Sequence, residues 1–195
     1  MEISFFDFDG TITNKDSLAD FIIYAIGDFS YYKGLLILSP MLLAYKLKII
    51  PNHIAKQKLI SYFFKGWDIR DFQKITKSYS KEKIIEIVRP KAIDRIKWHQ
   101  EKGHKIVVVS ASMEAWLKGW CKNYNLDLIG TKLEVSNNKI TGKFATENCY
   151  GIEKVNRIKE NYILEDYDII YAYGDSYGDK EMLSIADKKY YKYFD

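Results

Sequence analysis

Two aspartates close to the N-terminus carry the clearest chemical signal in the sequence. The apolar run Ile3–Phe6 is typical of a buried strand, and Asp7-Phe8-Asp9-Gly10-Thr11 follows it directly. Residues two apart in an extended chain point to the same side, so extended backbone through Asp9 would bring both carboxylates into one small space. Like charges at that distance repel unless a cation lies between them or one holds a proton. The stretch therefore indicates a site for a hard cation and an oxyanion.

Two other interpretations of this stretch involve no catalysis. The first is an acidic strand end followed by a glycine turn. The second is a calcium loop, which needs further oxygen ligands and a distal glutamate. Ile12 and Lys15 follow instead, which disfavours the calcium loop. On these residues alone a catalytic carboxylate pair and a structural turn explain the sequence equally well, so the remaining motifs must decide.

The composition sets the protein class. A chain of 195 residues with 47% hydrophobic and 29% charged residues predicts one globular core with room for a small insertion. The net charge of +4 is small and no nucleic-acid motif is present, so we expect no nucleic-acid partner. No obligatory protein partner is evident either. Cys121 and Cys149 lack metal-site spacing, and free thiols together with a strand that begins at residue 3 favour a cytoplasmic protein without a signal peptide.

The elements that must position the aspartates begin with a long helical stretch. Helices are predicted over 14–28 with Ser17 as its cap, from Asn52 to about Gly66 with Asn52 as its cap, after Asp68, and over 81–88. Residues 15–88 therefore read as an inserted helical module.

The most apolar part of this module is the segment 31–50. It carries no charge between Lys33 and Lys46, and Pro40 interrupts it. A bilayer span needs about 20 apolar residues, so this run is too short to cross a membrane. We expect a buried helical hairpin. The alternative is an interfacial, lipid-facing surface with lysines and tyrosines at its edges, which would give a weak contact with a membrane surface.

Strands and helices alternate after Pro90. A helix over 91–102 precedes the β-branched strand Lys105–Val109, whose lack of polar alternation is typical of a parallel strand covered on both faces. Asn137-Asn138 predicts a hairpin over 133–144. A helix over 152–161, a strand over 168–173, another helix and a last strand over 188–194 complete the chain. The alternation predicts an α/β fold with a parallel sheet.

Polar side chains follow three of the predicted strands. Asp7 and Asp9 follow the first, Ser110 the second, and Asp175 and Asp179 the third. Taken singly, Ser110 would be a helix cap and the two later aspartates turn residues. Ligands of parallel sheets bind beyond the carboxyl ends of the strands, however, so we expect these fragments to converge on one site.

The order of these motifs resembles the four-motif signature of the haloacid dehalogenase superfamily. The signature is carried by Asp7-x-Asp9-Gly10-Thr11, Ser110 after an apolar strand, Lys154, and Gly174-Asp175-x-x-x-Asp179. The stretches 103–112 and 174–179 are similar to subfamily IB, which includes phosphoserine phosphatases and phosphatidylglycerophosphatase-like enzymes. The resemblance implies a Rossmann-like core flanked by helices, formed by residues 1–14 and 89–195, with a small β-hairpin. It also implies an all-helical C1-type cap over 15–88.

The resemblance also implies a Mg²⁺-dependent phosphatase that hydrolyses a phosphate monoester through an aspartyl-phosphate. Asp7 would be the nucleophile, and Asp9 would protonate the leaving oxygen and then activate water. Lys154 would balance the charge of phosphate and nucleophile. The phosphoryl group would be bound by Gly10, Thr11, Ser110, Ala111 and Lys154. Mg²⁺ would be held by Asp7, the Asp9 carbonyl and Asp175, with Asp179 behind them orienting Lys154 or a metal-bound water.

The substrate follows less directly from the resemblance. Phosphoserine phosphatases have an asparagine before the last aspartate, where this chain has Gly178, and no substrate-binding arginine can be placed among the residues of the module. We therefore expect another small phosphorylated metabolite or a lipid phosphate. The alternatives are a phosphotransferase or mutase using the same intermediate, and a non-catalytic protein that binds a phosphorylated ligand.

Overall fold

A five-stranded parallel sheet forms the centre of the protein. The computed structural model describes all 195 residues. The strands lie in the order β3-β2-β1-β6-β7, and every neighbouring pair is parallel. This sheet confirms the predicted α/β fold, and it places β1 in the middle. The strands are β1 Glu2–Phe6, β2 Lys105–Met113, β3 Asp127–Thr131, β6 Ile169–Gly174 and β7 Lys188–Tyr191.

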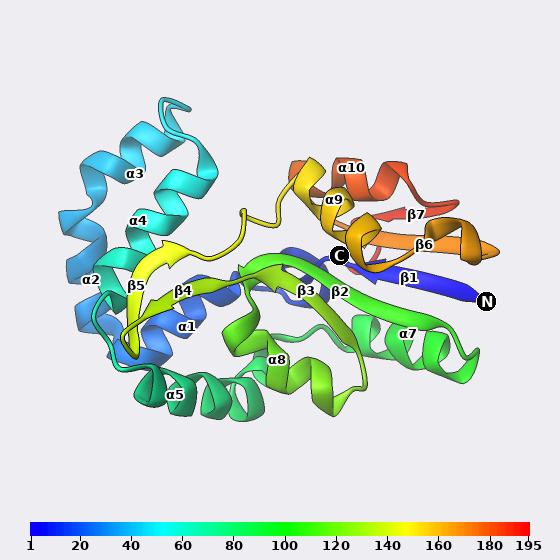
Figure 1. Cartoon of the computed structure of the whole chain (residues 1–195), viewed down its shortest axis with the longest axis horizontal. Helices are drawn as coiled ribbons and strands as arrows, with labels where there is room; N and C mark the ends of the chain where they lie inside the picture. The colour runs from blue at the N-terminus through cyan, green and yellow to red at the C-terminus, as the bar shows by residue number, and fades with distance from the viewer.

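Helices cover both faces of this sheet (Figure 1). Phe6 of β1 belongs to the apolar cluster that contains residues of α7 and α8, whereas Ile3 and Phe5 belong to the cluster with residues of α9 and α10. Burial on both faces explains why the strands lack polar alternation. The helices are α7 Pro90–Glu101, α8 Glu114–Asn123, α9 Ile152–Asn161 and α10 Lys180–Ser184.

Six α-helices lie between β1 and the core helix α7 in the chain. One of them, α5, packs on the core helix α8, where the Trp120 amide donates to Ser80 Oγ at 2.6 Å. The helices are α1 Ser17–Ile26, α2 Asp28–Ile37, α3 Ser39–Lys46, α4 Asn52–Phe64, α5 Ile69–Glu82 and α6 Ile84–Ile87. Figure 1 shows α2, α3 and α4 at the end of the molecule opposite the N-terminus.

The predicted hairpin is present as β4 Leu133–Ser136 and β5 Lys139–Phe144. Asn137 and Asn138 have φ values of 49° and 60°, as a tight hairpin turn of this kind requires. Ile140 hydrogen-bonds through its amide to the Trp67 carbonyl at 3.0 Å and through its carbonyl to the Gly66 amide at 2.8 Å. The hairpin is therefore bound to the loop between α4 and α5.

Two predicted helix caps are wrong. Asp16, not Ser17, caps α1, and its carboxylate accepts hydrogen bonds from the amides of residues 18 and 19. Pro51 occupies the cap position of α4, and the Asn52 side chain instead donates to the Tyr45 hydroxyl. In both cases a neighbouring residue fits the required extended backbone, which releases the polar side chain for a tertiary contact. The predicted cap Asp68 is confirmed by its bond from the Arg70 amide.

The expected burial of the segment 31–50 is also wrong. Only Gly34 of α2 is buried, and α3 contains no buried residue. Gly34 packs against α4 so closely that a Cβ atom there would lie 2.4 Å from the Phe63 ring. Tyr31 of α2 also stacks on Phe63, so one side of α2 packs on the protein. By contrast, Phe29, Tyr32 and Leu36 remain exposed. No helix in the structure combines the length and the apolar character needed to cross a membrane.

Two features of the sheet differ from the prediction. The strand β3 was not predicted, because Asp127 and Gly130 disfavour a strand and only pairing with β2 stabilises it. Ser110 does not cap a helix. The strand β2 continues to Met113, with a register shift against β3 between Ser110 and Met113.

Candidate active site

Three carboxylates converge at the carboxyl ends of β1 and β6. Oxygen atoms of Asp7, Asp175 and Asp179 all lie within 4.8 Å of one another. Asp7 follows β1 directly, and the two others lie in the turn after β6, the neighbouring strand in the sheet. The parallel topology therefore brings together residues that are about 170 positions apart in the sequence.

Lys154 lies among these carboxylates. Its side chain projects from α9 and is buried, and Nζ donates to Asp7 Oδ1 at 2.5 Å, Asp179 Oδ1 at 2.6 Å and the Val109 carbonyl at 2.8 Å. All three ammonium hydrogens therefore have partners. Burial lowers the pKa of Lys154, but the two carboxylates outweigh burial and raise it, so the side chain stays charged.

Asp179 is held rigidly by its own turn. Its Oδ2 atom accepts the amides of Asp175 at 3.2 Å and Ser176 at 2.9 Å, and the Ser176 hydroxyl at 2.8 Å. Burial raises the pKa of Asp179, but Lys154 and these hydrogen bonds outweigh burial and lower it. The ionised carboxylate therefore fixes the position of the Lys154 ammonium.

The turn after Asp9 fits against Asp175. The Thr11 hydroxyl donates to Asp175 Oδ1 at 2.9 Å, so this hydroxyl is committed to the aspartate and only the Thr11 amide is left for a phosphoryl group. Gly10 has a φ of 86°, and a Cβ atom there would lie 2.4 Å from Asp175 Oδ2. Glycine is required at this position both for the backbone conformation and for the space.

The Asp9 carboxylate is not one of the three carboxylates whose oxygens lie together. A turn over residues 8–12 begins directly after Asp7, and the charge of Asp9 is one of the smaller causes that raise the pKa of Asp7. Asp9 Oδ1 instead accepts the Ser17 amide at 2.7 Å, and Oδ2 accepts the Ser112 hydroxyl. Burial, and next the charge of Asp16, raise the pKa of Asp9, which favours a carboxyl that can carry a proton.

Ser110 and Ala111 lie within β2, toward its carboxyl end. Ser110 is buried, and its Oγ accepts the Ser112 amide at 3.0 Å, which orders the backbone where the register with β3 shifts. The Ala111 carbonyl accepts the Thr131 hydroxyl at 2.9 Å and the Lys56 ammonium at 3.0 Å. The structure thus places both predicted residues beside the cluster formed around Lys154, whose Nζ bonds the adjacent Val109 carbonyl.

Lys56 is a site residue that the sequence analysis missed. It projects from α4, and its Nζ reaches the backbone of the opposite side of the site at Ala111. Burial lowers the pKa of Lys56, and Asp9 and Asp16 act against that shift. The sequence alone carries no signal for this role, because the inward side of α4 is known only from the burial of Ile60, which lies four residues after Lys56.

Comparison with known proteins identifies the family. The sequence model of the haloacid dehalogenase-like hydrolases matches residues 4–184. The chain belongs to this family. Protein CicA of Caulobacter vibrioides is 34% identical over 97% of this chain and 85% of its own. A probable phosphatase of Mycobacterium tuberculosis is 32% identical over 62% of this chain and 43% of its own. The predicted family and enzyme class are thereby confirmed.

Solved structures share the fold at low sequence identity. A protein of unknown function from Bordetella pertussis Tohama I aligns over 95% of this chain and 86% of its own, with a TM-score of 0.82 and 18% identity. A substrate-bound phosphoserine phosphatase aligns over 97% of this chain and 84% of its own, with a TM-score of 0.69 and 18% identity. At this identity the likeness establishes the fold alone.

The residues of this hydrolase fit a divalent cation. Three carboxylates at −1 each and the Lys154 ammonium at +1 leave a net charge of −2 in a largely buried space. Burial raises the pKa of both Asp7 and Asp175, and a cation bound between them would oppose that shift by favouring the ionised carboxylates. The donor atoms are all oxygen, the type that Mg²⁺ prefers.

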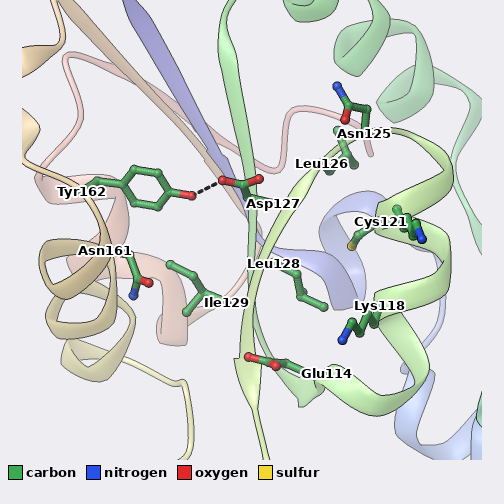
Figure 2. Close-up of a pocket in the computed structure, with 11 residues that line it drawn as sticks. Glu114, Lys118, Cys121, Asn125, Leu126, Asp127, Leu128, Ile129, Asn161 and Tyr162 are labelled. Atoms are coloured by element: carbon green, nitrogen blue, oxygen red, sulfur yellow. Dashed lines mark hydrogen bonds between the residues drawn. The ribbon is translucent and has the colours of Figure 1, made fainter. Parts of the chain in front are cut away.

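A pocket lies apart from this site, beside the edge strand β3 (Figure 2). Glu114 and Lys118 of α8 border it on one side and Asn161 and Tyr162 on the other. None of the candidate site residues lines this pocket, and its charged side chains are of both signs. We therefore assign the chemistry to the carboxylate cluster.

Proposed function

We propose that this hydrolase is a Mg²⁺-dependent phosphomonoesterase that works through an aspartyl-phosphate on Asp7. The observation that carries the proposal is the contact of Asp7 Oδ1 with the buried Lys154 ammonium, beside two further carboxylates. Lys154 occupies one Asp7 oxygen, and Oδ2 accepts no hydrogen bond from the protein. A carboxylate oriented in this way can attack phosphorus and divide one difficult displacement into two.

The proposed reaction assigns the proton transfers to Asp9. In the first step the Asp7–phosphorus bond forms, the ester phosphorus–oxygen bond breaks, and Asp9 gives a proton to the leaving oxygen. In the second step Asp9 removes a proton from water, which attacks phosphorus, so that inorganic phosphate leaves and Asp7 is regenerated. The raised pKa of Asp9 and its fixed bonds to Ser17 and Ser112 support this role.

Positioning of the phosphoryl group completes the proposal. The Ser110 hydroxyl and the backbone amides of Gly10, Thr11 and Ala111 would bind its oxygens, and Lys154 would balance its charge. The Asp7 and Asp175 carboxylates and the Asp9 carbonyl would hold Mg²⁺, which when bound neutralises negative charge on the phosphoryl oxygens. Asp179 would orient Lys154 by accepting a hydrogen bond from its ammonium group. Residues 1–14 and 89–195 would form the catalytic core and residues 15–88 the cap.

The proposed substrate is a small phosphorylated metabolite or a lipid phosphate. Gly178 weighs against phosphoserine-type recognition, because the asparagine of that pattern is absent and, with Tyr150 in its present position, a Cβ atom there would lie 2.2 Å from the ring. Lys56 is positioned to contact an anionic or polar group of the substrate near Ala111. Two buried free cysteines support a cytoplasmic location.

The test is phosphate release from a panel of monoesters: phosphoserine, sugar phosphates, lysophosphatidate and phosphatidylglycerophosphate. Release should require Mg²⁺, stop with EDTA and vanish in Asp7→Asn, while Asp28→Asn on the surface should behave as the wild type. Release that persists in Asp7→Asn would contradict the mechanism. Tight binding of BeF₃⁻ with Mg²⁺, without turnover of any ester, would favour a non-catalytic binding protein.

A further inference from the structure

The helices α2 and α3 expose apolar side chains that the rest of the chain does not cover. On α2, Phe29, Tyr32 and Leu36 recur at helical spacing and are 82%, 61% and 75% exposed. Leu43 of α3 and Leu47, which follows the last residue of α3, are also exposed. Exposed apolar residues that gather in this way mark an interaction surface. We name this surface the outer cap face and define it by Phe29, Tyr32, Leu36, Ile37, Leu43 and Leu47.

The segment that contains the outer cap face has a one-sided charge. Residues 29–67 include six lysines and no aspartate, glutamate or arginine. The whole chain has 30 basic and 26 acidic residues, so the remainder has 24 and 26 and is slightly negative. None of the exposed lysines of the segment forms an ion pair. These lysines are 33, 46, 48, 58 and 65.

We propose that the outer cap face docks the protein on the surface of an anionic phospholipid bilayer. The apolar side chains would enter the interface, and Lys33, Lys46 and Lys48 would contact the anionic headgroups. The helices α2 and α3 have 10 and 8 residues, about 15 and 12 Å of helix, so they lie in the interface instead of crossing about 30 Å of hydrocarbon.

The charge of this segment also argues against a second copy of the chain as the occupant. A two-fold contact places the same surface on both subunits, so the unpaired lysines of one copy would face those of the other. Like charges at such an interface weaken association. An anionic bilayer satisfies both the apolar side chains and the lysines, and it is therefore the partner that this surface fits.

Docking on this face would bring the bilayer to the helix layer next to the site. The backbone of α2 at Gly34 packs on Phe63 of α4, and α3 also packs on α4. On its inward side α4 carries Lys56, which reaches the site at Ala111. The consequence for the substrate rests on the proposed function: a phosphate ester held in the membrane becomes the favoured class.

The experiment is co-sedimentation of the full chain with unilamellar vesicles, of phosphatidylcholine alone or mixed with phosphatidylglycerol. The protein should sediment with the mixed vesicles only, and high salt should release it. The double variants Leu43→Ser/Leu47→Ser and Lys46→Glu/Lys48→Glu should each weaken binding about tenfold or more. The matched controls Ile163→Ser and Lys118→Glu/Lys122→Glu, which change exposed residues elsewhere, should bind as the wild type does.

Three outcomes would overturn the proposal. The first is that the protein does not sediment with the mixed vesicles. The second is that the outer-face variants bind vesicles as well as the wild type does. The third is a concentration-dependent dimer that disappears in Leu43→Ser/Leu47→Ser. The Asp7→Asn variant should keep full vesicle binding, because Asp7 lies at the sheet and not on this face. A protein that binds vesicles but releases no phosphate would therefore refute the proposed function alone.

Discussion

The carboxylate cluster and the outer cap face differ in how completely the chain satisfies its own side chains. At the cluster, all three ammonium hydrogens of Lys154 are donated to protein acceptors, and Asp179 accepts hydrogen bonds from Lys154 and from the Ser176 amide. On the outer cap face Leu36 is largely exposed, and the neighbouring Lys33 forms no ion pair. The first region is ordered for chemistry before any ligand arrives, whereas the second remains available to a partner.

This difference makes stability and activity separable by substitution. Changes at the cluster should affect both, because a removed partner leaves a buried charge without compensation. Changes on the outer cap face should affect neither in the absence of a membrane. The four predictions below test that separation.

The largest effect is expected from Lys154→Met. Removing one partner of a buried ion pair costs about 3–5 kcal/mol, and here two carboxylates lose their cation. We expect the free energy of unfolding to fall by that amount and phosphate release to stop. Urea unfolding of Lys154→Met beside Lys159→Met, an exposed lysine of the same helix, measures the effect. A loss below about 1 kcal/mol would show that the ion pair is not required for stability.

The second-largest effect is expected from Gly10→Ala, which tests the need for space at residue 10 separately from the need for its backbone conformation. Gly10→Ala and Gly27→Ala both place a side chain at positive φ, which costs about 1–3 kcal/mol in each variant. Only Gly10→Ala also displaces Asp175, since nothing lies within 4 Å of a Cβ at Gly27. We expect a loss of stability in both variants but a loss of kcat of about 100-fold in Gly10→Ala alone. Equal activities would mean that Asp175 does not need its present position.

A smaller effect is expected from Lys56→Met. A hydrogen bond to a charged group contributes about 1.5–3 kcal/mol, so losing a substrate contact should lower kcat/KM about tenfold or more. Steady-state kinetics on the best substrate of the panel would measure the change. Lys58→Met, an exposed lysine two positions further along α4, serves as the control. An unchanged kcat/KM in Lys56→Met would show that Lys56 does not contact the substrate.

The smallest effect is expected from Leu36→Ser. An exposed side chain without partners should change the free energy of unfolding by no more than about 0.5 kcal/mol. Phe64→Ala, a fully buried residue of the neighbouring α4, should cost about 3–5 kcal/mol in the same urea titration. A large loss in Leu36→Ser would show that another chain already covers the outer cap face in solution.

Much of the site was predictable from strand order alone. Once Ile3–Phe6, Lys105–Val109 and the strand before Asp175 are assigned to one parallel sheet, the residues after them must meet at one edge. The direction of the Asp9 side chain was not predictable, because a turn over residues 8–12 decides it. Lys56 was missed for a similar reason, since only the packing of α4 shows which lysine of this basic segment points inward.

The amino-acid sequence by itself determined the α/β fold, the family and the group of residues that could form the site. These follow from local patterns: β-branched runs, turn residues such as Asn137-Asn138, and motifs at strand ends. Only the tertiary structure decided which apolar residues are buried. Hydrophobicity along 31–50 favours burial in general, but burial requires a packing partner, and α2 finds one only along the side that carries Tyr31 and Gly34. No local sequence pattern shows whether a surface finds a packing partner. The exposure of the outer cap face is therefore known only from the way α2 and α3 pack on α4.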